Sequence, residues 1–187
     1  NSIAEAADRI RVLGVEGLRV AVTPALGISL APQALQVFRA EYPNVPVVIH
    51  IADSMTICKW TASGYCDLGL SASVALPQEV DSELIHTERA VCIVSVGHRL
   101  EKKRTIRPAD LAGESFISMP TYDIARRAVD RLFDPETRRL ELEASHSSAI
   151  CVMVGRGLGV SIVNPVLQRE LAVPGLRAIR FEPAIHF

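Results

Sequence analysis

The order of short apolar runs and helix-type stretches constrains the fold of this chain more than any other feature. In the first half the pattern reads strand 18–22, helix 31–42, strand 45–51, helix 54–63 and strand 68–70. The helices are indicated by apolar residues at spacings of three and four, such as Leu35, Phe38 and Tyr42. Parallel strands need crossovers of about this length. The sequence therefore predicts an α/β unit in which helices cover a parallel sheet.

The second half of the chain repeats this order. Its pattern reads strand 116–119, helix 123–132, strand 140–143, helix from Ser147 or Ser148, strand 160–163, helix from Asn164-Pro165 and strand 176–181. Between the halves, the apolar run Ala90 to Val96 is interpreted as a strand that crosses from one lobe to the other. We therefore expect two Rossmann-like lobes with parallel-rich sheets joined by crossing hinge strands. Lobe I is expected over 14–95 with a return segment at 182–187, and lobe II over 96–181.

Polar residues follow the predicted strands where their carboxyl ends should meet. The loops concerned are 23–29, 52–56 and 71–74 in the first lobe, and 120–123, 144–148 and 164–165 in the second. Open α/β sheets bind ligands at this edge, and in a two-lobed molecule both edges can face one cleft. Backbone N–H groups at helix starts, joined by hydroxyls, form a receptor for a carboxylate. A small anionic or zwitterionic ligand is therefore expected.

Each of these polar residues also has a purely structural explanation. Ser54, Asp123, Ser147 and Asn164 stand where an N-cap is needed, and for any one of them capping is the commoner role. Asp123 could cap its helix or accept hydrogen bonds from a ligand amino or guanidino group, and both roles stay open. His146 could donate to a ligand or simply cap and pack beside a helix start. Their convergence on one predicted cleft is what favours ligand binding.

Composition and motif searches argue against other kinds of function. Twenty Lys plus Arg against 21 Asp plus Glu leave a formal charge of −1, so we expect no broad positive field for nucleic acid. The basic stretch 99–107 is interpreted as a solvated loop. Gly155-x-Gly157-x-Gly159 follows a helix and precedes a strand, the reverse of a dinucleotide fingerprint, so Gly157 is expected to end the helix. We expect no cofactor, and no catalytic motif is present.

The cysteine and histidine spacings predict neither disulfides nor a metal site. Cys58, Cys66, Cys92 and Cys151 form no C-x-x-C pair, and the remaining histidines have no ligand spacing with them. No run reaches the length of a membrane span, and the first residues lack a secretory apolar region. A reduced, cytoplasmic protein is expected.

The sequence resembles the regulatory domain of LysR-type transcriptional regulators. Four stretches carry the likeness: Gly17-Leu-Arg-Val-Ala-Val-Thr-Pro24, Ser63-Gly-Tyr-Cys-Asp-Leu-Gly-Leu70, Pro108-Ala-Asp-Leu-Ala-Gly113 and Val154-Gly-Arg-Gly-Leu-Gly-Val-Ser-Ile-Val-Asn-Pro165. The resemblance implies a fold like that of type II periplasmic binding proteins. It also implies that residues 1–13 end a helix leading to a winged helix-turn-helix domain outside this chain, through which DNA is bound. Homodimers or homotetramers are implied as well.

Three further stretches resemble the branch of this family that responds to opines and related amino-acid derivatives. They are Glu88-Arg-Ala-Val-Cys92, Ser145-His146-Ser147 and Glu182-Pro-Ala-Ile185. The resemblance implies an effector between the lobes, and the residues expected to line its site are Thr23, Ala25, Ser54, Met55, Ser71, Thr121, Asp123, His146, Ser147 and Asn164. Tyr65-Cys66 and Pro120-Thr121-Tyr122 depart from the family pattern, and the second departure lies on the expected cleft wall. The alternatives are a transport-type solute-binding protein and an enzyme on the same scaffold.

Overall fold

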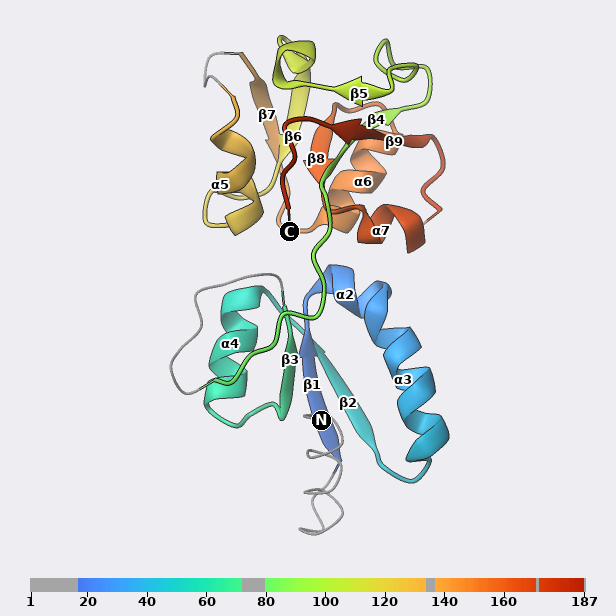
Figure 1. The fold of residues 1–187 in the computed structure, drawn as a ribbon, viewed down its shortest axis with the longest axis vertical. Coiled ribbons are helices and arrows are strands. Elements are labelled where there is room, and N and C mark those ends of the chain that lie inside the picture. Colours follow the sequence, from blue (N-terminus) through green and yellow to red (C-terminus); the bar gives the residue numbers. More distant parts are fainter. Residues whose placement is uncertain (1–16, 72–79, 134–136, 171, 187) are drawn as a thin grey trace. The chain divides into compact units, whose positions relative to one another are not determined.

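The computed structural model describes residues 17–71, 80–133, 137–170 and 172–186 of the chain. These residues belong to two compact units, Asn1–Glu83 (unit 1) and Leu84–Phe187 (unit 2), each of which is described by itself (Figure 1). The lead-in helix predicted over 1–13 and most of the predicted loop 71–74 lie outside the described residues.

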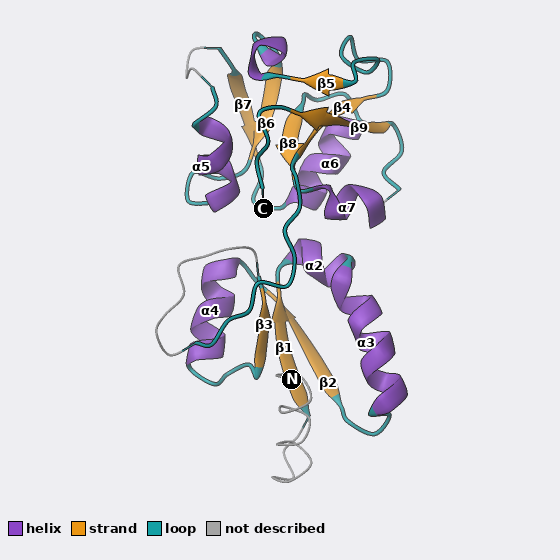
Figure 2. Cartoon of the chain, in the orientation of Figure 1, coloured by secondary structure: helices purple, strands orange, loops and turns teal. Residues whose placement is uncertain are grey.

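Unit 1 is a three-stranded parallel sheet with helices packed on it (Figure 2). Its elements are β1 (Leu18–Val22), α2 (Pro24–Ile28), α3 (Leu30–Glu41), β2 (Val47–Ile51), α4 (Ser54–Ala62) and β3 (Leu68–Leu70). The strand order is β2-β1-β3, and β1 pairs with both neighbours in parallel. This confirms the strand and helix order predicted for the first half.

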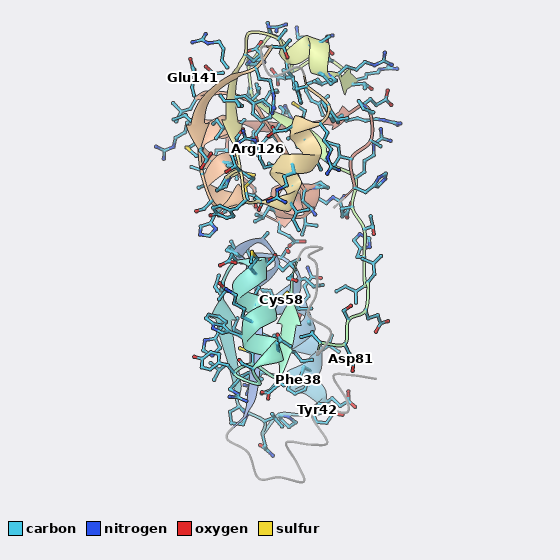
Figure 3. The ribbon with its side chains drawn as sticks, turned by 90° about the vertical axis from the view of Figure 1, so that its left-hand side faces the viewer. Phe38, Tyr42, Cys58, Asp81, Arg126 and Glu141 are labelled. Atoms are coloured by element: carbon cyan, nitrogen blue, oxygen red, sulfur yellow. The ribbon has the colours of Figure 1, made fainter. Side chains whose placement is uncertain are left out.

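The side chains of β1 alternate between two apolar clusters, as the period of a strand requires. Leu18, Val20 and Val22 pack with Phe38 of α3, whereas Ala21 packs with Ile57 of α4. Phe38 also stacks on Tyr42, with ring centroids 5.0 Å apart (Figure 3). The central strand is therefore buried on both faces, which is the usual condition of a parallel sheet.

Unit 2 has a mixed four-stranded sheet and a parallel pair of strands. Its elements are β4 (Val91–Ser95), β5 (Thr105–Ile106), the 3-10 helix η1 (Pro108–Leu111), β6 (Ser115–Ser118), α5 (Ile124–Asp130), β7 (Arg139–Glu143), α6 (Ser147–Gly155), β8 (Ser161–Val163), α7 (Pro165–Glu170) and β9 (Leu176–Phe181). The four-stranded sheet has the order β5-β9-β4-β8. β6 pairs with β7 in parallel, and a single parallel bridge joins Phe116 to Val160 just before β8.

The strand β4 lies at the centre of unit 2, and this differs from two expectations. It pairs antiparallel with both β8 and β9, so the second half does not repeat the all-parallel sheet of the first. The division of the chain falls between Glu83 and Leu84 instead of at 95/96, because the backbone partners of β4 are all in unit 2. The expected return segment also pairs within unit 2, where Ala90 N–H donates to the Ile185 carbonyl at 2.8 Å.

Three short elements were not predicted. Residues 24–28, expected as part of a loop, form α2, with Thr23 as its extended N-cap and a proline at its start. β5 has two residues and η1 has four, and periodicity cannot reveal elements that short. In contrast, Gly157 follows α6 with a φ of 78°, which confirms the predicted left-handed end of that helix.

Candidate functional site

In unit 1 the carboxyl ends of the three strands are joined by backbone hydrogen bonds. Thr23 N–H donates to the Leu70 carbonyl at 3.1 Å, and Ala52 N–H donates to the Val22 carbonyl at 3.1 Å. The residues that follow the strands therefore share one rim, which holds Thr23, Ala25, Ser54, Met55 and Ser71. Met55 is the most exposed of the large apolar residues there, at 62%. These five residues follow the carboxyl ends of the three strands of unit 1, and their role in binding stays a prediction.

The N-cap of α4 is Asp53, so the prediction of Ser54 was wrong by one residue. The Asp53 carboxylate accepts from Thr56 N–H at 3.0 Å and from the Thr56 hydroxyl at 2.6 Å. These bonds hold the pKa of Asp53 below its ordinary value. Asp53 is the N-cap instead of Ser54 because its carboxylate accepts hydrogen bonds from both the N–H and the hydroxyl of Thr56, the third helical residue. Ser54 is then the first residue of the helix. Asp53 thus adds a negative charge to the rim that the sequence analysis did not place there.

In unit 2 the strands β6, β7 and β8 also end at one edge. Ala144 N–H donates to the Ser118 carbonyl at 2.9 Å, which ties the end of β7 to the end of β6. The residues after these strands are Thr121, Asp123, His146, Ser147 and Asn164. Because the three strands run parallel to one another, these residues follow the same edge of unit 2, which is named the second rim.

The cap residues of the second rim differ in what their side chains do. Asp123 caps α5 by accepting from Ala125 N–H at 2.7 Å, and Asn164 accepts from Val166 N–H at 3.0 Å. The predicted caps at these two positions are confirmed. At α6 the N-cap is His146 and not Ser147 or Ser148, and its imidazole makes no capping bond. The chain turns one residue earlier than expected, and the exposed His146 ring lies at the rim.

Arg126 is a structural support of the second rim that the sequence analysis missed. Its side chain is 10% exposed, donating to the Met119 carbonyl at 2.9 Å and to the Asp130 carboxylate at 2.7 Å (Figure 3). It therefore fixes the backbone just before Thr121. An arginine in the first turn of a polar helix gives no sequence signal for this role, because it is indistinguishable from a solvated one.

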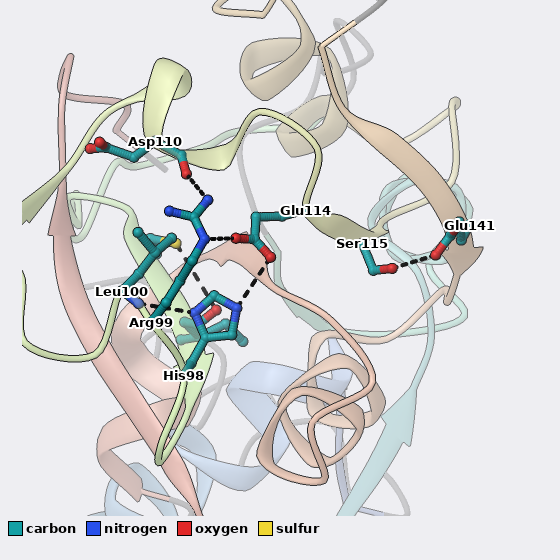
Figure 4. Close-up of polar contacts among 9 residues, drawn as sticks. His98, Arg99, Leu100, Asp110, Glu114, Ser115 and Glu141 are labelled. Carbon is teal, nitrogen blue, oxygen red and sulfur yellow. Dashed lines mark hydrogen bonds and ion pairs between the residues drawn. The ribbon is translucent and has the colours of Figure 1, made fainter.

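Basic residues of the stretch 99–107 form ion pairs within unit 2, among them Arg99 (Figure 4). Arg99 pairs with Glu114 and also donates to the Asp110 carbonyl. Lys103 pairs with Asp110 and, as the first cause, lowers the pKa of that carboxyl. The stretch was predicted as a solvated loop; Arg99 and Lys103 are indeed solvent-exposed although ion-paired, whereas Thr105 and Ile106 form β5.

Several general features of the described residues bear on chemistry. All four cysteines are buried thiols, and burial raises the pKa of Cys151 to about 11, so this group is a poor nucleophile. Within the described ranges, no three His, Cys, Asp or Glu side chains are placed to hold a metal ion. Over the same ranges, no helix has the length and apolar character that crossing a membrane requires. A groove beside Gly155, Val173 and Pro174 lies at the far end of α6 from His146.

Comparison with known families identifies the chain. The model of the LysR substrate binding domain matches residues 15–187. The chain belongs to the LysR substrate binding domain family. Transcriptional activator protein LysR of Escherichia coli (strain K12) is 33% identical over 187 residues, covering 99% of this chain and 60% of that protein. Regulatory protein NocR of Agrobacterium tumefaciens (strain T37) is 30% identical over 189 residues, covering 99% and 62%. This LysR-family domain therefore spans about 60% of the length of these relatives.

Solved structures show the same fold. The C-terminal domain of a probable LysR family transcriptional regulator from Rhodococcus sp. RHA1 has a TM-score of 0.76 at 21% identity, covering 92% of this chain and 87% of that one. The BenM effector binding domain with its effector benzoate has a TM-score of 0.72 at 17% identity, covering 91% and 81%. The expected fold class, that of LysR-family effector-binding domains, is confirmed.

Proposed function

We propose that this domain is the effector-sensing part of a LysR-type transcriptional regulator, and that it binds a small amino-acid-like or carboxylate ligand. The observation that carries the proposal is the family match over residues 15–187. DNA is read through a winged helix-turn-helix domain outside this chain, since the curated relatives are longer. The formal charge of −1 supports a domain that does not itself hold DNA. Family membership favours this function over a transport-type solute-binding protein.

We propose that residues of the two rims, which each unit presents by itself, bind the effector. The residues concerned are Thr23, Ala25, Ser54, Met55, Ser71, Thr121, Asp123, His146, Ser147 and Asn164. The helices α4 and α6 are each nine residues long, and the backbone N–H groups of their first turns favour an anion. Asp53 and Asp123 supply carboxylates for an ammonium group. A zwitterion suits this combination better than a simple anion does.

The effector class follows from this chemistry together with the relatives. Benzoate, the effector of the BenM domain, carries a carboxylate. The resemblance to the opine-responsive branch adds an amino group to the expected ligand. We therefore propose an opine, a basic amino acid or diaminopimelate, bound without turnover.

Effector binding would act by a population shift. A ligand changes the balance between two arrangements of the domain only as far as it binds one better than the other. The change is passed to the DNA-reading domain, within a homodimer or homotetramer. Light scattering on the purified protein measures that assembly directly. A cytoplasmic location fits a regulator whose four cysteines are free thiols.

A thermal-shift screen tests the ligand proposal. The panel is nopaline, octopine, lysine, arginine and diaminopimelate, each added to the 187-residue chain. A ligand at one hundred times its Kd stabilises the folded state by about 2.7 kcal/mol, which gives a clear rise in Tm. If none of the five compounds raises the Tm, the proposed effector class is wrong.

Paired variants test the two rims. Ser54→Phe fills the first rim and His146→Trp the second, and neither residue makes the capping bond of its helix. Ser63→Phe, at the other end of α4, and Arg131→Trp, at the end of α5, are the matched controls. We expect both rim variants to abolish the shift while both controls keep it. Loss of the shift in only one rim variant would show that a single unit holds the effector.

A further inference from the structure

The segment that enters unit 2 is fastened to α7 by a bidentate ion pair. This joining segment comprises residues 84–90 and leads into β4. Arg169 donates to the two carboxylate oxygens of Glu88 at 2.7 and 2.9 Å, and His86 lies 3.1 Å from the same carboxylate. Although Arg169 is exposed, the Glu88 side chain is only 15% exposed. Paired geometry of this kind is the strong form of a charge-assisted hydrogen bond.

The other end of α7 carries a candidate effector residue. Asn164 precedes Pro165, and its side chain accepts from Val166 N–H in the first turn. Leu167 is buried at 1% exposure, which anchors the middle of the six-residue helix in the core. Asn164 and Arg169 therefore stand at opposite ends of one short helix.

The joining segment is also held on its other side. Arg89 donates to the Phe181 carbonyl at 3.1 Å, and Ala90 N–H donates to the Ile185 carbonyl at 2.8 Å. Beyond it, Val91 of β4 is paired with Val163, the residue before Asn164. The joining segment thus comes next to the Asn164 loop where it leads into β4. Through Glu88 it is also bound to α7.

We propose that the Glu88–Arg169 ion pair couples the Asn164 loop to the joining segment, so that a ligand contact at Asn164 is transmitted to the chain between the two units. The regulatory meaning of this coupling rests on the proposed function. The coupling itself is a property of unit 2 and is measurable without any ligand. Glu88 and Arg169 are positioning residues in this proposal, since they act through the joining segment.

Amide hydrogen exchange of Ala90 reports on the coupling. This buried N–H belongs to the joining segment and donates to the Ile185 carbonyl. The variants are Asn164→Ala, Glu88→Gln and the double variant in the 187-residue chain. We expect Glu88→Gln to speed Ala90 exchange about fivefold, the effect of losing roughly 1 kcal/mol of ion pairing. Asn164→Ala should speed it in the wild-type background and add nothing further in the Glu88→Gln background.

Two controls separate coupling from general loosening of unit 2. Glu101→Gln removes the Glu101–Arg177 ion pair, 3.2 Å long and in the same unit, and should leave Ala90 exchange unchanged. Arg169→Gln should reproduce Glu88→Gln. The proposal is overturned if Asn164→Ala acts equally in both backgrounds, or if it leaves Ala90 exchange unaltered. Failure of the thermal-shift screen, by contrast, would remove the effector class without changing this exchange cycle.

Discussion

Two buried serine hydroxyls in unit 2 illustrate how a single hydrogen bond changes what a serine contributes to the stability of the fold. Ser161 Oγ donates to the Ile117 carbonyl at 2.7 Å, whereas Ser118 Oγ has no hydrogen-bond partner among the described residues. Each serine is 2% exposed. A buried polar group without a partner loses its hydration with no compensation.

The two serines should therefore respond oppositely to alanine. Ser161→Ala leaves the Ile117 carbonyl short of a donor and should lower the free energy of unfolding by about 1 kcal/mol. Ser118→Ala removes only an unpaired hydroxyl and should be neutral or slightly stabilising. Urea unfolding followed by far-UV circular dichroism compares the two. Equal destabilisation would mean that Ser118 has a hydrogen-bond partner in solution.

Asp53 gives unit 1 a pH-dependent contribution to stability. Its pKa is lowered in the folded state by Thr56, first through the hydroxyl and then through the backbone N–H. Stability from such a group is complete above the unfolded-state pKa of about 3.9 and is lost as the pH falls through the lower folded-state pKa. Asp53→Asn keeps a good N-cap and removes the titration.

We expect the variant to lose less stability than the wild type between about pH 5 and pH 2. Trp60, the single tryptophan of the chain, lies on the helix that Asp53 caps, so its fluorescence follows unfolding of unit 1. Glu101→Gln, in unit 2, is the control and should leave the Trp60 profile unchanged. Parallel acid profiles for Asp53→Asn and wild type would contradict the assignment.

At the scale of elements, hydrophobic periodicity predicted the long segments well. The strands at 18–22, 68–70 and 176–181 have the bounds that were expected, because their apolar residues are bounded by turns and polar residues. Cap positions were harder, since Ile-Ala-Asp-Ser and Ser-His-Ser-Ser each offer several acceptable N-caps in a row. Only the local backbone turn selects between them, and that turn depends on where the preceding strand stops pairing.

Close backbone approach is another feature that the sequence does not reveal. A methyl group added at Gly155, the last residue of α6, would lie 2.8 Å from the Pro174 carbonyl oxygen. Added at Gly27 in α2, it would meet the flexible end of Ile51 at 2.7 Å. The same substitution therefore faces rigid backbone in one helix and a movable side chain in the other.

Alanine at these two glycines should have different effects. Replacing a helical glycine gains about 1 kcal/mol of helix propensity, but forcing atoms into a packed site costs about 1–3 kcal/mol. We expect Gly155→Ala to lower the Tm because the carbonyl cannot move aside, and Gly27→Ala to be close to neutral. Calorimetry on the two variants measures the difference. A stabilised Gly155→Ala would show that the 172–175 loop adapts.

For the whole molecule, the sequence predicted two lobes divided at 95/96, whereas the two compact units divide between Glu83 and Leu84. An apolar run such as Ala90 to Val96 suits a crossing strand and a central strand equally well, because both are buried on two faces. Pairing partners decide the matter, and they are distant in sequence. For example, Val91 pairs with Val163 on one side and with Arg180 on the other.

The position of β4 leads to a prediction about where the chain can be divided. A fragment of residues 84–187 keeps the sheet order β5-β9-β4-β8, so it should fold with a cooperative thermal transition. A fragment of residues 96–187 loses the central strand and, with it, Cys92, Ile93 and Val94, each 0% exposed. Burial of two such aliphatic side chains is worth about 3–6 kcal/mol, a large part of a small domain's stability of about 5–15 kcal/mol.

The shorter fragment should therefore lack dispersed amide resonances and a cooperative melt. The two N-terminal fragments that remain, residues 1–83 and 1–95, also test whether β4 belongs to unit 2. Residues 1–83 end before β4 and should stay monomeric, whereas residues 1–95 carry the apolar strand without its partners and should self-associate. Circular dichroism and light scattering on the four fragments test this. A cooperatively folded 96–187 fragment would place β4 with unit 1, because only then could unit 2 complete its core without that strand.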